Sequence, residues 1–423
     1  MERLLVRANG PLSGTVAING AKNSVLKCMA ACLLATGRHR IGNVPAITDV
    51  SIMADVLAAM GATTTHSGRG TEGALEIDVP ADVTPIAPYE LVERIRASIV
   101  VLGPLLTRYG YAKVSMPGGD DFGERPIDMH LRAFEELGAE FSAEHGYVEG
   151  RCHRLVGARI VLEYPSHTAT DNVLMAAVLA KGTTVIENAA REPEVRDLAA
   201  MLTDMGARIE GAGTSHVEIE GVEQLRPTEH TAIPDRVEAA TFLAAVGLAG
   251  GEIQLDHARP EHMDMLLHKL GTIGVHCVPN SDGILATSDG RLSSVDVSTL
   301  PYPGVATDYK PALVTLLSVA DGVAIVSENI FAGRFRYIDE LRRMGARISI
   351  EGHHAVVRGI PRLSGAQVRA PDIRAGAALV LAGLVAVGET EVSGVAHIER
   401  GYEDFDGRLR ALGADVTRVA GDS

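Results

Sequence analysis

Charged and polar side chains recur in this sequence where six Ala-, Leu- and Val-rich helices are predicted to begin. The openings are GAKN at 20–23, RIRAS at 94–98, SHTATDN at 166–172, PDR at 234–236, TDYK at 307–310 and DIR at 372–374. Helix N-termini attract anions through free N–H groups, whereas Lys and Arg are locally unfavourable there. Any one such charge is most often solvated or salt-bridged, but the recurrence indicates that the set serves an anionic ligand.

Two further segments hold groups suited to acid–base chemistry. The segment PGGDDFGERPIDMH at 117–130 places Asp120 and Asp121 between glycines, which permit a mobile or strained backbone, and Arg125 follows. In HIERGYEDF at 397–405, Arg400 follows a predicted strand. The sequence shows no Walker loop, dinucleotide fingerprint, zinc-ligand spacing or Ser-His-Asp order. Because Arg geometry suits phosphate and carboxylate, the residues alone predict an anionic ligand and metal-free acid–base chemistry.

The elements that position these groups are organised by a repeat of about 70 residues. One glycine series follows an apolar residue and precedes Ala or Val, at Gly61, Gly138, Gly206, Gly274, Gly345 and Gly413. A second series ends the Ala- and Leu-rich helices, at Gly37, Gly110, Gly182, Gly251, Gly322 and Gly388. Each period contains strand, helix, strand, amphipathic helix and hairpin. The sequence therefore predicts an α/β fold of six β-α-β-α-β-β units.

Six units of this length are most economically arranged as two pseudo-symmetric domains of three units each. The turn-rich segment PTEHTAIP at 227–234 lies at the midpoint and is the predicted linker. We predict one domain at 20–230, which carries a mobile loop at 117–125. The second domain is predicted at 1–19 plus 231–423, with the active site in the cleft between the two.

Composition limits the function further. Among 423 residues, 39 are Lys or Arg and 54 are Asp or Glu, so the net charge of −15 argues against a nucleic-acid partner. The four cysteines are interpreted as buried apolar residues rather than disulfide or metal ligands. No apolar run is long enough to span a bilayer, and the N-terminal segment has no signal-peptide core. We expect a cytoplasmic protein with no membrane partner and no obligate protein partner.

The motifs resemble the enolpyruvyl transferase family along essentially the whole chain, and within it the branch that acts on UDP-N-acetylglucosamine. The matching segments are GAKN (20–23), RASIVVLGPL (96–105), PGG and GERPIDMH (117–130), ENAAREPE (187–194), PDR (234–236), TD (307–308), RF and MGA (334–346) and HIERGY (397–402). Their order along the chain is more specific than any single motif. The resemblance implies two inside-out α/β domains of three β-α-β-α-β-β units, in agreement with the repeats.

The resemblance implies transfer of the enolpyruvyl group of phosphoenolpyruvate to a hydroxyl of a uridine nucleotide, without a cofactor. The acceptor hydroxyl adds to C2 while C3 gains a proton, and phosphate and a C3 proton then leave. The residues implied in catalysis are Asp120, Asp308, Lys22 and Arg400, and Asp308 takes the acceptor proton. Those implied in binding phosphoenolpyruvate are Lys22, Asn23, Arg96, Arg125, Arg334, Arg374 and Arg400. Those implied in binding the nucleotide are Arg125, Pro126, Asp128, Met129, His130, Ser166, His167, Thr168, Asp308, Lys310 and Ile330.

Asp120 stands where most members of the family carry Cys as the proton donor to C3. A carboxylic acid can fill this role if burial or like charge raises its pKa, and Asp121 and Glu124 are its neighbours in sequence. A carboxylate is also a poorer epoxide nucleophile than a thiolate. The sequence therefore predicts resistance to alkylation by fosfomycin.

The phosphate-binding loop departs from the family pattern, which leaves the acceptor open. The family usually reads Ser-Val-Gly-Ala-Thr where this chain reads SHTAT at 166–170, and Thr168 adds a side chain where backbone approaches phosphate. Lys310 replaces a common Gln, so His167 and Lys310 are both candidates to meet a terminal phosphate. We expect transfer to the 3-hydroxyl of UDP-N-acetylglucosamine for peptidoglycan synthesis. A specialised paralogue transferring to the 3′-hydroxyl of UMP, in nucleoside antibiotic biosynthesis, is the alternative.

Two other readings are disfavoured. The shikimate branch of the family has an acceptor without uridine, and the segment 125–130 argues against it. A non-catalytic binding paralogue is disfavoured because Lys22, Arg125, Asp308 and Arg400 are all present. Because the reaction must exclude water, we expect the two domains to close when the acceptor binds, carrying the 117–125 loop inward.

Overall fold

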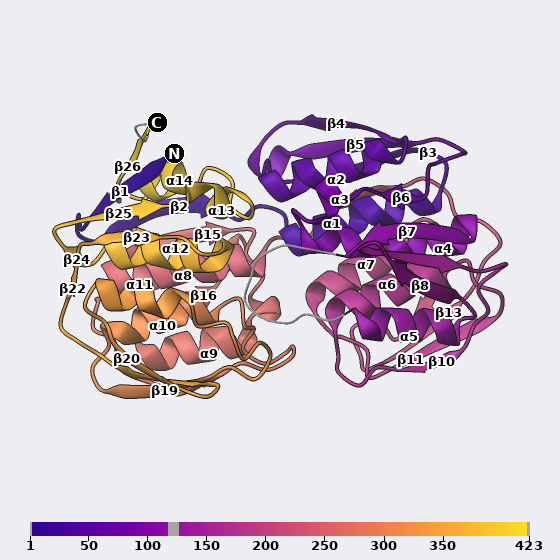
Figure 1. Ribbon diagram of the computed structural model, residues 1–423. Helices are drawn as coiled ribbons and strands as arrows, with labels where there is room; N and C mark the ends of the chain where they lie inside the picture. The colour runs from indigo at the N-terminus through magenta and orange to yellow at the C-terminus, as the bar shows by residue number, and fades with distance from the viewer. Residues whose placement is uncertain (1, 117–126, 421–423) are drawn as a thin grey trace. The chain divides into compact units, whose positions relative to one another are not determined.

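A computed structural model describes residues 2–116 and 127–420 of the chain (Figure 1). These residues divide into two compact units. Unit 1 consists of residues 2–19 and 234–420, and unit 2 consists of residues 20–116 and 127–233. Each unit contains its own cluster of buried apolar side chains, so each has a separate hydrophobic core.

Unit 2 contains three four-stranded sheets, with strand orders β14-β3-β5-β4, β6-β7-β9-β8 and β10-β11-β13-β12. The strands are β3 (Gly37–Gly42), β4 (Thr63–Ser67), β5 (Ala74–Val79), β6 (Ile86–Ala87), β7 (Tyr111–Ser115), β8 (Glu140–Glu144), β9 (Tyr147–Arg151), β10 (Arg159–Val161), β11 (Thr183–Glu187), β12 (Arg208–Glu210), β13 (His216–Glu220) and β14 (Glu229–Thr231). The helices are α1 (Lys22–Ala31), α2 (Thr48–Ala59), α3 (Tyr89–Val92), α4 (Leu102–Tyr109), α5 (Asp128–Glu136), α6 (His167–Ala177) and α7 (Pro193–Asp204), with 3₁₀ turns η1 (Cys32–Leu34), η2 (Gly70–Glu72) and η3 (Arg96–Val101).

Unit 1 repeats this arrangement, with strand orders β16-β17-β15-β2, β18-β19-β21-β20 and β23-β25-β1-β26 and a small sheet β22-β24. The strands are β1 (Arg3–Arg7), β2 (Leu12–Ala17), β15 (Gly251–Asp256), β16 (His276–Pro279), β17 (Gly283–Ser288), β18 (Val297–Ser298), β19 (Val323–Ser327), β20 (Arg347–Glu351), β21 (His354–Arg358), β22 (Leu363–Ser364), β23 (Gln367–Arg369), β24 (Ala386–Val387), β25 (Glu389–Ser393) and β26 (Asp415–Val419). The helices are α8 (Arg236–Ala249), α9 (Asp264–Ile273), α10 (Lys310–Ser318), α11 (Tyr337–Arg343), α12 (Ile373–Gly383), α13 (Val395–Glu399) and α14 (Phe405–Ala411), with the 3₁₀ turn η4 (Pro260–His262).

All six large sheets share one topology, which confirms the predicted β-α-β-α-β-β units. In each sheet one edge strand is parallel to its neighbour and the other two neighbouring pairs are antiparallel, as in the sheet that contains the β10–β11, β11–β13 and β12–β13 pairs. Three units borrow a strand from a distant part of the chain. β14 pairs with β3, β2 pairs with β15, and β1 lies between β25 and β26. The N- and C-terminal strands are therefore neighbours in one sheet (Figure 1).

The repeating glycines occupy positions that require a left-handed backbone. All twelve have φ between 67° and 118°, where a residue without Cβ is favoured. The second series does not uniformly end helices as predicted. Gly110 caps α4, whereas Gly37 and Gly251 are the first residues of β3 and β15, because those helices end before the glycine.

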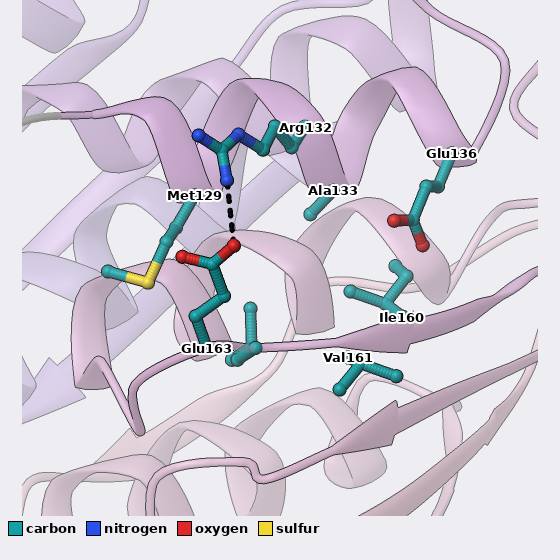
Figure 2. Close-up of a pocket in the computed structure, with 8 residues that line it drawn as sticks. Met129, Arg132, Ala133, Glu136, Ile160, Val161 and Glu163 are labelled. Carbon is teal, nitrogen blue, oxygen red and sulfur yellow. Dashed lines mark hydrogen bonds and ion pairs between the residues drawn. The ribbon is translucent and has the colours of Figure 1, made fainter.

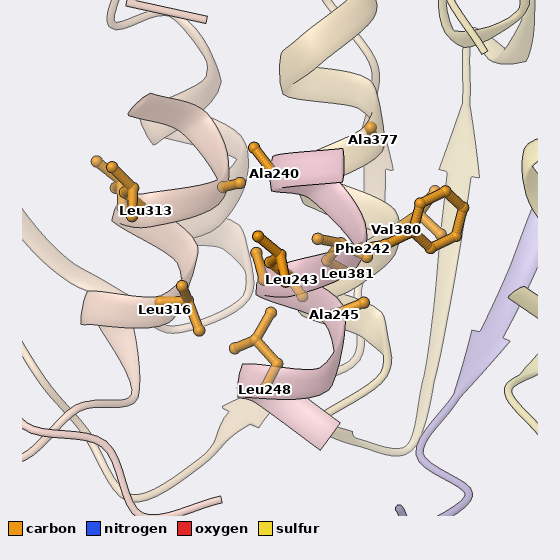
Figure 3. Close-up of a cluster of buried hydrophobic side chains, with 14 of the residues drawn as sticks. Ala240, Phe242, Leu243, Ala245, Leu248, Leu313, Leu316, Ala377, Val380 and Leu381 are labelled. Atoms are coloured by element: carbon orange, nitrogen blue, oxygen red, sulfur yellow. The ribbon is translucent and has the colours of Figure 1, made fainter. Parts of the chain in front are cut away.

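In unit 1, the first helix of each repeat (α8, α10 and α12) is buried in the hydrophobic core, and the sheets lie outside these helices. Every residue of α10 and α12 is buried, as are all but one of α8. Figure 3 shows Leu243 and Leu248 of α8 gathered with Leu313 and Leu316 of α10 and with Leu381 of α12. Strands such as β13 alternate buried and exposed residues, as expected when one sheet face meets solvent. The hydrophobic core thus fixes where the six helix openings lie.

Within the described residues, every helix is too short or too polar to pass through a lipid bilayer.

Candidate active site

The start of α1 is positioned by a close backbone approach. A side chain at Gly20 would place its Cβ 1.7 Å from the carbonyl oxygen of Asn43, so only Gly fits there. The next turn brings the Nζ of Lys22 to 2.7 Å from the Oδ2 of Asp49, which lies in the first turn of α2. The Asp49 side chain is 3% exposed and that of Lys22 is 13% exposed. Asp49 therefore holds the Lys22 side chain in a fixed position, and Asn23 beside it is half-buried.

His130, on α5, is held by an amide from α6. The backbone N–H of Gly103 donates to Asn172 Oδ1 at 2.8 Å, and Asn172 Nδ2 donates to the carbonyl of Ile99 at 3.0 Å. This fixes the amide orientation, so its second N–H donates to His130 Nδ1 at 3.0 Å. Burial, with help from the Arg96 charge, lowers the pKa of His130 to about 4. At neutral pH the ring is therefore uncharged and carries its proton on Nε2.

The opening of α6 carries the predicted phosphate loop. The Ser166 side chain caps the helix by accepting from the Ala169 N–H at 3.3 Å, and its Oγ lies 3.4 Å from the Thr168 hydroxyl. His167, the first residue of α6, lies against Lys27 of α1, with 3.0 Å between His167 Nδ1 and Lys27 Nζ. Lys27 in turn is paired with buried Asp171 at 2.5 Å. The sequence analysis did not identify Lys27 or Asp171. Each lies in the interior of a helix, and nothing local in the sequence indicates that the two side chains meet.

Asp128 and Met129 lie on another surface of α5. Asp128 pairs with Arg132 at 3.4 Å, and Arg132 reaches Glu163 at 2.9 Å. Figure 2 shows Met129 close to Arg132 and Glu163. These residues line an open pocket of about 100 Å³ that also contacts β10. His130 points instead toward α6. The structure therefore does not bring the Met129 and His130 side chains together, although they are adjacent in sequence.

In unit 1, Asp308 lies beside two buried arginines. Arg334 Nη1 donates to Asp308 Oδ1 at 2.6 Å and to the Thr307 hydroxyl at 3.2 Å. Arg374 Nε lies 3.8 Å from Asp308 Oδ2. The arginine side chains are 4% and 5% exposed, whereas Asp308 is 27% exposed. The carboxylate is thus accessible, and its geometry is set by groups behind it.

Arg374 is placed by the start of α12, where Asp372 caps the helix by accepting from the N–H groups of residues 374 and 375 at 2.9 Å. Its guanidinium lies 5.0 Å from the Tyr402 ring centroid and 3.9 Å from Asp235. Burial disfavours its charge, but Tyr402, Asp235 and Asp308 outweigh burial and hold the pKa of Arg374 above its usual range. Its Nη1 has no hydrogen-bond partner among the described residues. A buried charged donor of this kind suits a ligand anion.

Lys310 does not lie where the sequence predicted. Its side chain is fully buried, and Nζ lies 2.8 Å from Glu328 Oε2 and donates to the Arg334 carbonyl at 2.5 Å. Nζ also lies 3.9 Å from the Phe335 ring centroid. Burial lowers the pKa of Lys310 to about 8. The expectation that this amine meets a terminal phosphate is therefore corrected, because its donors already bind groups of its own unit.

Glu328 is a structural centre that the sequence did not reveal. Its carboxylate accepts from the Thr299 and Thr307 hydroxyls at 2.8 and 2.7 Å and from the N–H of Ile330 at 2.9 Å. The pKa of Glu328 is lowered, because Lys310 and the hydroxyls outweigh the effect of burial. Ile330, a predicted nucleotide contact, is half-buried and held by this carboxylate. A single Glu after a strand gives no sequence signal for such a role.

Arg400 follows a helix rather than the predicted strand. It is the C-cap of α13, which begins after Gly394 turns the chain with φ 75°, and it is half-buried. A cation at a helix C-terminus is electrostatically favourable. Asp120, Arg125 and Pro126, with the predicted loop at 117–125, lie outside the described residues.

One cluster of potential metal ligands occurs among the described residues, formed by Cys28, Asp197 and His230. Asp197 is already engaged, because Ser24 donates to it and His230 Nε2 lies 2.9 Å away. Burial and the Asp197 charge raise the pKa of the Cys28 thiol well above its usual range. Contacts to Asp197 from Ser24 and His230 thus join α1, α7 and β14 at this cluster.

Comparison with known proteins shows the family to which the chain belongs. The family model "EPSP synthase (3-phosphoshikimate 1-carboxyvinyltransferase)" matches residues 6–409. UDP-N-acetylglucosamine 1-carboxyvinyltransferases of Nocardia farcinica (strain IFM 10152) and Anaeromyxobacter sp. (strain Fw109-5) are 50% and 49% identical over 422 and 420 residues, with 99% of each chain covered. The chain belongs to the UDP-N-acetylglucosamine 1-carboxyvinyltransferase family.

Two solved structures of enolpyruvyl transferases are similar to this carboxyvinyltransferase along the whole chain. The enolpyruvyl transferase NikO from Streptomyces tendae has a TM-score of 0.88 at 27% identity, covering 100% of this chain and 99% of its own. EPSP synthase from Acinetobacter baumannii has a TM-score of 0.75 at 17% identity, with 99% and 100% covered, which shows a shared fold. The predicted fold of six repeated units in an enolpyruvyl transferase is therefore confirmed.

Proposed function

We propose that this carboxyvinyltransferase moves the enolpyruvyl group of phosphoenolpyruvate to the 3-hydroxyl of UDP-N-acetylglucosamine and releases phosphate. The product would be a precursor of peptidoglycan. The observation that carries the proposal is the Asp308 carboxylate, accessible and held by Arg334 at 2.6 Å. It is supported by relatives of that name that are 46–50% identical over at least 98% of the chain.

The proposed first step is addition of the acceptor hydroxyl across the double bond. Asp308 accepts the hydroxyl proton while the oxygen attacks C2, and Asp120 supplies a proton to C3. Negative charge is present on the phosphate and carboxylate throughout. Arg374 offers a buried, charged donor to these oxygens, and Lys22 and Arg400 are proposed to bind them as well.

The second step is elimination. Loss of phosphate from C2 and of a proton from C3 restores the double bond, and the cations that bound phosphoenolpyruvate then stabilise the leaving phosphate. Arg96, Asn23 and Arg125 complete the proposed phosphoenolpyruvate set. The reaction needs no cofactor.

In this proposal a separate group of residues binds the nucleotide. His130 offers an uncharged ring with Nε2–H, and Asp128 and Ser166 are half-buried. His167 and Thr168 lie at the α6 opening, where free N–H groups favour phosphate oxygens. Pro126, Met129 and Ile330 remain predicted contacts. Because both substrates are cytoplasmic metabolites, we expect the enzyme to act in the cytoplasm.

UMP is the second candidate acceptor, favoured by the SHTAT sequence at 166–170. The deciding experiment measures phosphate release from phosphoenolpyruvate with UDP-N-acetylglucosamine and, in parallel, with UMP. Turnover with the sugar nucleotide supports the proposal. Turnover with UMP alone would overturn it and make Thr168 the first position to exchange for Gly.

A further inference from the structure

His167 is joined to a buried ion pair that lies outside the proposed catalytic set. Its ring Nδ1 is 3.0 Å from Lys27 Nζ, and Lys27 Nζ is 2.5 Å from Asp171 Oδ2. The Lys27 and Asp171 side chains are 4% and 0% exposed, whereas His167 is 41% exposed. One side of the imidazole therefore contacts the protein interior, and much of the rest is open to solvent.

This contact determines which ring nitrogen carries the proton. An ammonium group has donors and no acceptor, so His167 Nδ1 must accept from Lys27 and must be unprotonated. Asp171 Oδ2 is 3.8 Å from the same nitrogen, which is too far for a hydrogen bond. The contact with Lys27 therefore determines whether Nδ1 carries the proton. The proton of the neutral ring then resides on Nε2. A second proton on Nδ1 would face the Lys27 ammonium directly.

Charges of both signs surround the ring: the Lys27 ammonium, 3.0 Å from Nδ1, opposes a second proton there, whereas the Asp171 carboxylate, 3.8 Å away, favours it. Asp171 is the buried counter-charge of Lys27 on α6, and Lys27 comes from α1. His130 on α5 also faces this region: after burial, the charges that act on its pKa are those of Arg96, Asp171, His167 and Asp128. His130 itself is uncharged and carries its proton on Nε2. Two neighbouring histidines thus present neutral N–H donors.

We propose that Lys27 and Asp171 position His167 as a neutral donor, and that its Nε2–H binds a phosphate oxygen of the nucleotide acceptor at the start of α6. This proposal rests on the proposed function, because it assumes a nucleotide with a phosphate at this loop. Lys27 acts through His167 and is a positioning residue. The free N–H groups of α6 supply further donors, so the phosphate meets donors whose protons are fixed before binding.

The first test exchanges His167 for two amides that each mimic one ring nitrogen. Gln places its amide nitrogen where Nε2 lies, and Asn places its amide nitrogen where Nδ1 lies. We expect His167→Gln to keep the KM for UDP-N-acetylglucosamine within about threefold, and His167→Asn to raise it about tenfold. The KM for phosphoenolpyruvate is measured beside it, so that an effect on the nucleotide is separated from a general effect on the enzyme. Equal effects of the two variants would overturn the proposal.

The second test reads the tautomer directly. In long-range ¹H–¹⁵N NMR spectra of the whole enzyme, we expect His167 Nε2 to be protonated and Nδ1 unprotonated. Because Lys27→Met alone leaves Asp171 buried without its partner, the test variant is Lys27→Met/Asp171→Asn, which should lose the tautomer preference and raise the KM for the nucleotide. Exposed Lys181→Met is the matched control and should change neither. A proton on Nδ1 in the wild-type enzyme would overturn the proposal.

Failure of the proposed function is distinguishable from failure of this inference. Absence of phosphate release with UDP-N-acetylglucosamine would reject the function, whereas calorimetric binding of that nucleotide to His167→Gln and His167→Asn still decides the role of Nε2. Tighter binding to His167→Gln than to His167→Asn would support the inference. Equal binding would overturn it whether or not the enzyme turns over.

Discussion

Asp308 is a carboxylate whose position depends on groups that are more buried than itself. Arg334 donates to one oxygen and Arg374 lies near the other, so rotation of the side chain is restricted. A fixed carboxylate is suited to accept a proton from a hydroxyl that approaches from the exposed side. An amide at this position would keep the size but lose the basicity.

We therefore expect Asp308→Asn to lower kcat for phosphate release by at least about 100-fold, with a smaller change in the KM for phosphoenolpyruvate. Steady-state kinetics with both substrates give this measurement. The matched control is Asp339→Asn, because Asp339 also accepts from an arginine Nη1, at 2.8 Å, but is 71% exposed. The control should keep its activity. Comparable losses in the two variants would contradict the role assigned to Asp308.

The lowered pKa of His130 predicts how stability changes with pH. Its pKa is about 4 in the folded chain and about 6.5 when exposed, so the unfolded state takes up the proton first as pH falls. Its stabilising contribution is complete above pH 6.5 and is lost on the way down to pH 4. The stability difference between wild type and His130→Gln should therefore shrink by about 3 kcal/mol over this range. Urea unfolding at several pH values measures it, and exposed His276→Gln should show no such trend.

The carboxylate at position 120 leads to a prediction about inactivation by fosfomycin. A carboxylate attacks an epoxide less readily than a thiolate, so fosfomycin should leave the wild-type enzyme active. Asp120→Cys should become inactivated progressively over time and gain the mass of one inhibitor molecule. Asp121→Cys is the control, since it places a thiol one residue away in the same segment. Inactivation of the wild-type enzyme with an adduct at Asp120 would contradict the prediction.

At the scale of elements, the start of α1 depends on Gly20. A Cβ there would lie 1.7 Å from the Asn43 carbonyl oxygen, and backbone would have to move to relieve the contact. We expect Gly20→Ala to lower the free energy of unfolding by about 1–3 kcal/mol and to reduce activity through Lys22. In α9, a Cβ at Gly271 would meet no atom within 4 Å, so Gly271→Ala should be neutral or stabilising. Thermal unfolding and phosphate release compare the two.

The helix openings were predictable from the sequence, and the partners of their side chains were not. Periodic glycines and apolar helices identify where α1, α6, α10 and α12 begin, because these signals are local. The Lys310–Glu328 and Lys27–Asp171 pairs join residues 18 and 144 positions apart, and nothing local indicates that they meet. Lys310 was misassigned for this reason, since its burial is decided by packing of distant elements.

At the scale of the molecule, the sequence repeat made the order of helices and strands predictable. The pairing of strands from distant parts of the sequence was harder to predict. The six units follow from the glycine spacing, but three are completed by strands that belong elsewhere in sequence. β1 is central in its sheet, pairing with both β25 and β26, although it stands at the N-terminus. A sequence repeat reports which elements recur, whereas the strand that completes a sheet depends on long-range pairing.

The described residues of unit 2 all lie between positions 20 and 233 and have their own core, so we expect a fragment of residues 20–233 to fold alone. Its last strand, β14, pairs with β3, and His230 and the Ile233 N–H bind Asp197 at 2.9 and 3.3 Å. A fragment of residues 20–226 lacks all these contacts and should lose much of its stability. Urea unfolding followed by circular dichroism would show one cooperative transition for the longer fragment and an earlier one for the shorter. If both fragments unfolded at the same urea concentration, β14 would not be part of the independently stable unit.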